Sequence, residues 1–140
     1  MVYEIEKNLR SLKRQANQTE KYYSYKEEYK NKKVCMIFQP HRFSRTAQLF
    51  DDFIKVLKQT DSLIMLDIYS ASERPIKGIN SRRIVETLKQ NGHKDVTYLK
   101  KHDDVIDLIK KKKDDFDILV TQGAGSVSNI CQIIKNQWEK

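Results

Sequence analysis

Apolar and polar residues follow two alternating patterns along most of the chain. From Val34 onward, short continuous apolar runs are followed by longer segments in which apolar residues recur every three to four positions. Continuous runs of this length are typical of strands buried on both faces, and the longer spacing is typical of amphipathic helices. The predicted strands cover residues 34–38, 62–69, 96–99 and 117–121, and the predicted helices cover residues 45–59, 81–91, 103–113 and 126–138.

This order of elements, a strand followed by a helix four times over, predicts an α/β fold. Strands that alternate with helices of this length form a mostly parallel sheet with helices on both faces. Local signals support the helix ends: Asn80 or Ser81 is expected to cap one helix, and Gly92 is expected to end it. The helix over 103–113 begins with acids and ends with lysines, which complements the helix dipole.

Residues 1–32 have a different composition, without Gly or Pro and rich in Lys, Glu, Gln and Tyr. Apolar residues recur there at helical spacing, at Val2, Ile5, Leu9 and Leu12. We therefore predict a charged N-terminal extension of one or two exposed helices over residues 1–32, followed by a single domain over residues 33–140.

The net charge of +8 is concentrated near the N-terminus, where residues 1–33 hold nine Lys or Arg against five Asp or Glu. A basic balance permits nucleic-acid binding. The chain has no aromatic RNA-binding motif and no helix-turn-helix pattern, and its four consecutive lysines (110–113) end a predicted helix. We therefore do not expect nucleic acid as the partner.

The two cysteines, Cys35 and Cys131, both lie within apolar runs and are expected to be buried free thiols. No cluster of Cys and His has the spacing of a zinc site, so we expect no metal site. No apolar run approaches the roughly 20 residues that span a bilayer, and the N-terminus does not resemble a signal peptide. We expect a cytoplasmic protein without a membrane partner.

Candidate chemistry begins with the stretch FQPHRFSRT, which places His41, Arg42 and Arg45 directly after the first predicted strand. Paired guanidinium N–H groups match a carboxylate or a phosphate, and a helix N-terminus adds backbone N–H donors. Cations at this end of a helix oppose its dipole unless an anion binds there. The alternative interpretation is two surface arginines beside a helix-capping loop.

Two further polar segments follow predicted strands and are expected at the same edge of the sheet, because ligands bind outside the carboxyl ends of parallel strands. In TQGAGS, residues 121–126, glycines allow close backbone approach, and Gln122, Gly123 and Gly125 are candidate cleft-lining residues. In the other segment, Glu73 either holds an ammonium group or pairs with Arg74.

The histidines His93 and His102 flank predicted turns without an evident partner, and we expect both at the surface.

Taken together, the segments FQPHRFSRT, LFDDFIKVL, LDIYSASERPIKGINSR and TQGAGSV resemble the C-terminal domain of the bacterial Mur ligases, most closely the UDP-N-acetylmuramate–L-alanine ligases. The resemblance covers about residues 33–138 and implies a Rossmann-like fold. It also implies that His41, Arg42 and Arg45 contact the incoming amino acid, with the arginines facing its carboxylate.

In this family, ATP and magnesium activate the carboxylate of UDP-N-acetylmuramate during peptidoglycan precursor synthesis, and the amine of L-alanine then attacks it. The chain departs from the family pattern because it has no P-loop sequence and no uridine-nucleotide domain. We therefore expect a detached or truncated C-terminal domain that is inactive alone and holds no catalytic residue and no cofactor. The missing Mur ligase domains are a candidate partner.

Two alternatives remain open at the level of sequence. One is a non-enzymatic binding module in which the basic N-terminal helix engages RNA or a protein partner. The other is a remnant without function, with which the same residues are compatible.

Overall fold

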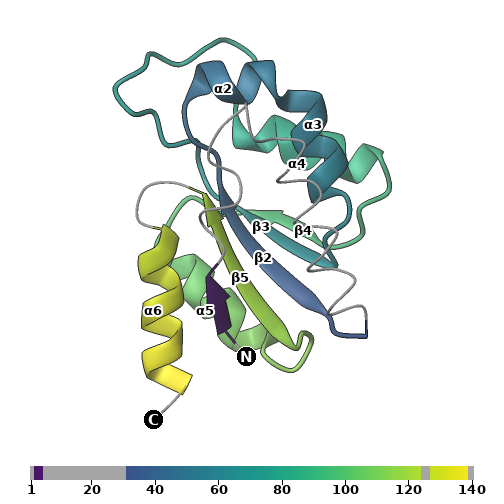
Figure 1. Cartoon of the computed structure of the whole chain (residues 1–140), viewed down its shortest axis with the longest axis vertical. Coiled ribbons are helices and arrows are strands. Elements are labelled where there is room, and N and C mark those ends of the chain that lie inside the picture. The colour runs from purple at the N-terminus through teal and green to yellow at the C-terminus, as the bar shows by residue number, and fades with distance from the viewer. Residues whose placement is uncertain (1, 5–30, 124–126, 139–140) are drawn as a thin grey trace.

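A five-stranded parallel sheet forms the centre of the molecule (Figure 1). The computed structural model describes residues 2–4, 31–123 and 127–138. The strands are β1 (Val2–Glu4), β2 (Val34–Gln39), β3 (Ser62–Met65), β4 (Val96–Tyr98) and β5 (Ile118–Gly123), and their order across the sheet is β1-β5-β2-β3-β4. The chain therefore builds outward from β2 to β4 and then returns to the other side of β2 with β5.

Helices cover both faces of this sheet, as the alternating pattern predicted (Figure 1). One face is covered by α2 (Phe43–Gln48), α3 (Phe50–Leu57) and α4 (Ser81–Gln90), and the other is covered by α5 (His102–Lys112) and α6 (Val127–Trp138). Successive residues of a buried strand point to opposite faces, so each strand contributes to two separate cores.

The two cores divide β2 residue by residue. Met36 and Phe38 pack with apolar residues of α3 and α4, whereas Cys35 and Ile37 pack with α5 and α6. This two-sided burial explains why the strand has a continuous apolar sequence rather than an alternating one. Cys35 and Cys131 are both buried free thiols, as predicted, and burial raises the pKa of the Cys35 thiol to about 11.

Two predicted elements differ from the structure in extent. The single helix predicted over 45–59 is two helices, because the backbone at Leu49 leaves helical geometry with φ −103° and ψ 12° while its side chain enters the core. The strand predicted over 62–69 ends as β3 at Met65. Two residues after the end of β3, the side-chain amide of Gln39 donates to the backbone carbonyl of Asp67. A side chain thus replaces the backbone N–H that would bond this carbonyl in a continuous strand.

The prediction of helix for residues 1–32 is wrong for Val2–Glu4, which form the edge strand β1. This strand pairs in parallel with β5, with Tyr3 opposite Val120. Helical spacing of apolar residues could not reveal this, because a strand is selected here by the backbone groups that β5 offers to a neighbour. The rest of the predicted helical extension, residues 5–30, lies outside the described residues.

Predicted local signals at the ends of α4 are confirmed. The side chain of Asn80 accepts a hydrogen bond from the backbone N–H of Arg83 (2.9 Å), which satisfies one of the free N–H groups of the first turn. Gly92 follows the helix with φ +91°, a conformation that glycine adopts without strain.

His93 is buried, with 9% of its surface exposed, and the prediction that it lies at the surface is wrong. Its Nε2 lies 2.9 Å from the hydroxyl of Thr60, and its Nδ1 accepts from the backbone N–H of Asp95 at 3.2 Å. Because the Thr60 hydroxyl donates to Leu57, the ring must carry its proton on Nε2 and is neutral. Burial lowers the pKa of His93, although the carboxylates of Asp95 and Asp61 act in the opposite direction.

At the opposite end of the sheet, Gly123 is required by a close approach of two backbones. It ends β5 with φ +123°, and a Cβ built at this position would lie 2.0 Å from the carbonyl oxygen of Gln39 on β2. The glycine that the sequence marked as a ligand-approach residue thus has a structural role of its own. It lets β2 and β5 stay paired up to their last residues.

We predict that Gly123→Ala lowers the free energy of unfolding by about 3 kcal/mol, because the substitution adds a backbone clash to an unfavourable φ. Gly92→Ala is the matched control, since Gly92 also has positive φ but has no atom within 4 Å of the added Cβ. It should cost only about 1–2 kcal/mol. Urea denaturation of both variants measures their free energies of unfolding. Equal losses of stability would show that the backbone at Gln39 moves away from the added Cβ without an energetic penalty.

We also predict that the protein loses stability as the pH falls below about 6.5, the ordinary pKa of histidine. The folded-state pKa of His93 is lowered, so below that pH the unfolded chain binds a proton that the folded chain refuses. Between pH 7.5 and 5.5, the free energy of unfolding should fall less for His93→Leu than for the unaltered protein, as measured by denaturation at both pH values. His41 also has a lowered pKa, so His41→Leu serves as a comparison. An unchanged loss in His93→Leu would contradict the assignment.

Candidate functional site

The predicted site residues that the structure describes lie at the carboxyl edge of the sheet, on β5, on the loops that follow β2 and β3, and on α2. Phe38 is in register with Gln122, and Gln39 with Gly123, so the two strands end side by side. The chain after β2 turns toward α2 on one face, and the chain after β5 leads to α6 on the other (Figure 1). This is the point where the strand order reverses, which is where open parallel sheets bind ligands.

The loop after β2 is fixed to the loop after β3. The backbone N–H of Tyr69 donates to Pro40 and the N–H of Arg42 donates to Tyr69, both at 2.8 Å. Between them, the rings of His41 and Tyr69 stack with centroids 5.7 Å apart and planes inclined by 12°. These contacts set the position of the basic residues before any ligand is bound.

Arg42 adopts an unusual backbone conformation, with φ +70° and ψ 142°. Few residues other than glycine adopt positive φ, because the Cβ then crowds the backbone. The conformation is held by the hydrogen bond to Tyr69 and by α2, which begins at the next residue, Phe43. Arginine is therefore kept at a position where glycine would be less strained, and strain of this kind clusters at functional sites.

Glu73 occupies the start of α2, and it does so through Ser44 rather than by pairing with Arg74. Its Oε1 accepts from the backbone N–H of Ser44 at 2.9 Å, and its Oε2 accepts from the Ser44 hydroxyl at 2.6 Å. These two hydrogen bonds, with a smaller contribution from the charge of Arg42, lower the pKa of Glu73. The N–H donors that the sequence assigned to a bound anion are thus partly taken by the protein's own carboxylate.

The electrostatics of His41 show that the predicted basic residues do gather. Burial, followed by the positive charges of Arg45 and Arg42, lowers the pKa of His41, and the charge of Glu73 acts in the opposite direction. His41 is therefore neutral at pH 7, and its ring offers one N–H donor and one acceptor rather than a third positive charge. Arg45 is the third residue of α2 rather than its first, because the helix begins two residues earlier than predicted.

Three buried side-chain atoms in the described part of the chain have no hydrogen-bond partner, and all three belong to the last residues of β2 and β5. They are Gln39 Oε1, Thr121 Oγ1 and Gln122 Nε2. Thr121 and Gln122 are 0% and 2% exposed. Buried polar groups are almost always paired with protein or water, so this edge holds polar groups for which the described residues supply no complement.

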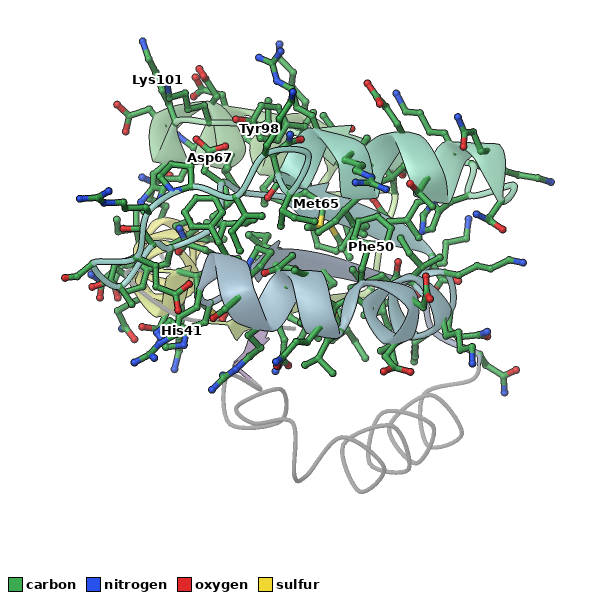
Figure 2. The ribbon with its side chains drawn as sticks, turned by 90° about the horizontal axis from the view of Figure 1, so that it is seen from above. His41, Phe50, Met65, Asp67, Tyr98 and Lys101 are labelled. Carbon is green, nitrogen blue, oxygen red and sulfur yellow. The ribbon has the colours of Figure 1, made fainter. Side chains whose placement is uncertain are left out.

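A group that the sequence did not single out lies beside this edge. The hydroxyl of Tyr98, at the end of β4, donates to the carboxylate of Asp67, and the guanidinium of Arg82 lies 5.1 Å from the centroid of the Tyr98 ring (Figure 2). Burial and the Asp67 carboxylate raise the pKa of Tyr98. A weak signal was present in the sequence, since Asp67 and Tyr98 are polar groups near the carboxyl ends of predicted strands.

Of the predicted site residues, the structure brings His41, Arg42, Arg45 and Glu73 together, and it places Gln122 and Gly123 at the end of the adjacent strand. Gly125 lies outside the described residues. No group of three or more His, Cys, Asp or Glu within the described ranges has the arrangement of a metal site. In the same part of the chain, every helix is too short or too polar to cross a membrane.

Comparison with known proteins identifies the fold. No family model matches the chain. The structure is similar to the crystal structure of UDP-N-acetylmuramate-alanine ligase MurC from Thermotoga maritima, with a TM-score of 0.62 and 19% sequence identity. The chain has a Mur-ligase-like fold. The match covers 88% of this chain and 24% of the ligase chain, so the chain spans about a quarter of the length of that protein.

We predict that Arg42→Gly is more stable than Arg42→Ala by about 1 kcal/mol. Both variants lack the guanidinium, so the difference between them reports the strain of positive φ less the extra backbone entropy that glycine loses on folding. Urea denaturation measures it. Equal stabilities would mean that the loop relaxes out of the strained conformation once the arginine is removed.

Proposed function

We propose that this chain is the amino-acid-binding domain of a Mur-type ligase, which acts in peptidoglycan precursor synthesis by joining L-alanine to UDP-N-acetylmuramate. The observation that carries the proposal is the gathering of His41, Arg42 and Arg45 at the carboxyl edge of a Mur-ligase-like fold. The sequence motifs and the fold similarity both support a Mur-type ligase.

In this proposal, the guanidinium groups of Arg42 and Arg45 bind the carboxylate of the amino acid. A guanidinium donates two parallel hydrogen bonds to a carboxylate, which fixes the direction of the ligand as well as its position. Neutral His41 supplies an orienting hydrogen bond without adding positive charge. Orientation of this kind is what an amine nucleophile requires, since the rate of an acyl transfer depends on holding the attacking nitrogen in line with the acyl carbon.

ATP and magnesium are assigned to parts of the ligase other than this chain. The sequence contains no P-loop, and the described residues contain no carboxylate cluster that would hold a metal ion. The residues present therefore do not fit these groups, and the proposed role of the chain ends at the amino acid and at the surface that meets the other ligase domains. Alone, the chain is expected to be inactive.

The side-chain atoms of Gln39, Thr121 and Gln122 that have no hydrogen-bond partner among the described residues are consistent with an edge that binds a ligand or a further domain. In a ligase that closes over its substrates, a bound amino acid or an approaching domain would supply the complementary donors and acceptors. The alternative of an RNA- or protein-binding module depends on residues 1–32, of which 5–30 lie outside the described residues, and no observation of the structure favours it.

The test is reconstitution with the nucleotide-binding domains of a UDP-N-acetylmuramate–alanine ligase that lacks its own C-terminal domain. We expect release of ADP that depends on L-alanine only when this chain is added. Arg42→Ala and Arg45→Ala should each lower that rate at least tenfold. Lys55→Ala, an exposed cation on α3, is the control and should leave it unchanged. Failure of the chain to restore activity, together with no binding of L-alanine, would contradict the proposal.

A further inference from the structure

The carboxylate of Glu73 lies inside the basic cluster and is fixed there. Its two oxygens accept hydrogen bonds from the backbone N–H and the hydroxyl of Ser44, at 2.9 Å and 2.6 Å. The charge of Arg42 acts on Glu73, and the charge of Glu73 acts on His41. The loop that carries Glu73 is positioned by two further residues with positive φ, Ala71 at 50° and Ser72 at 70°. Glu73 is thus held beside the arginines by the conformation of its own loop as well as by Ser44.

This carboxylate changes the charge that the cluster offers to a ligand. The charged groups that act on His41 are two guanidinium groups, those of Arg42 and Arg45, and one carboxylate, that of Glu73. His41 itself is neutral at pH 7, because its pKa is lowered. Glu73 therefore lowers the positive charge of the cluster by one unit.

Glu73 also removes backbone donors that a phosphate would use. Free N–H groups at a helix start are the common binding site for phosphate, and here the N–H of Ser44 is already bonded to a carboxylate. The guanidinium group of Arg42 carries paired N–H donors that match a planar carboxylate. Charge and donor geometry thus favour the same kind of ligand.

We propose that Glu73 is a specificity-determining residue, which adapts the cluster of His41, Arg42 and Arg45 to a ligand group with a single negative charge, a monocarboxylate, and against a phosphate dianion. This inference rests on the proposed function, because it concerns the same site. In the setting of a ligase, the discrimination would keep the amino-acid site free of the phosphate groups that surround an ATP-dependent reaction.

The experiment compares L-alanine and inorganic phosphate as ligands of the chain at pH 8, where phosphate is mainly a dianion. Binding is followed through the ring resonances of His41, which report charge placed on the arginines. The unaltered chain should bind L-alanine more tightly than phosphate. Glu73→Gln keeps the shape of the side chain and an oxygen for the Ser44 N–H but removes the charge. It should shift the ratio of affinities toward phosphate by roughly five- to tenfold.

Ser44→Ala is the matched control, because it removes one hydrogen bond to Glu73 while leaving the charge in place. It should lower stability without changing the ratio of affinities. An equal shift in Ser44→Ala and Glu73→Gln would assign Glu73 a purely structural role and overturn the inference.

The outcomes separate this inference from the proposed function. If the unaltered chain does not bind L-alanine, alone or in the reconstituted ligase, the proposed function fails. If it binds L-alanine but Glu73→Gln leaves the ratio unchanged, only the role of Glu73 fails. If Glu73→Gln does not fold, the affinities of the unaltered chain provide the test by themselves. Tighter binding of phosphate than of L-alanine would overturn the inference.

Discussion

The pairing of β2 with β5 is the contact on which the rest of the structure depends. It runs in register from Val34 opposite Ile118 to Gln39 opposite Gly123, and it joins the first strand of the domain to the last. Because β5 returns to the far side of β2, the helices that come after these two strands, α2 and α6, cover opposite faces of the sheet. The carboxyl ends of the two strands are adjacent, so Gln122 and Gly123 lie beside the start of the loop that carries His41 and Arg42. Without Gly123 the two backbones could not remain in contact up to that point.

The two edges of the sheet use polar residues in different ways. At the amino edge, His93, Thr60 and Asp95 satisfy one another, and Lys112 forms an ion pair of 2.6 Å with Asp95. At the carboxyl edge, an arginine is kept in a strained conformation and three buried polar atoms lack partners within the described residues. Satisfied polar groups are typical of positions that serve stability, whereas strain and missing partners are typical of positions that serve binding.

The position of Glu73 changes how the basic segment is understood. From the residues alone, two arginines near a helix start indicate a general anion site with backbone donors available. In the structure, the protein's own carboxylate accepts two hydrogen bonds from Ser44 at the helix start and interacts electrostatically with Arg42. Under the proposal made for Glu73, the site is suited to a ligand with one carboxylate rather than to any anion.

The sequence by itself determined the order of strands and helices, the two-sided burial of the sheet and the edge at which the polar segments meet. Those features follow from the spacing of apolar residues and from the rules of parallel sheets, which depend on local periodicity. Only the tertiary structure decided the edge strand Val2–Glu4, the burial of His93 and the partner of Glu73. Each of these depends on a group distant in sequence: a free strand edge on β5, a threonine 33 residues away, and a serine 29 residues away. Local spacing carries no information about such partners, because folding brings them together through contacts made elsewhere in the core.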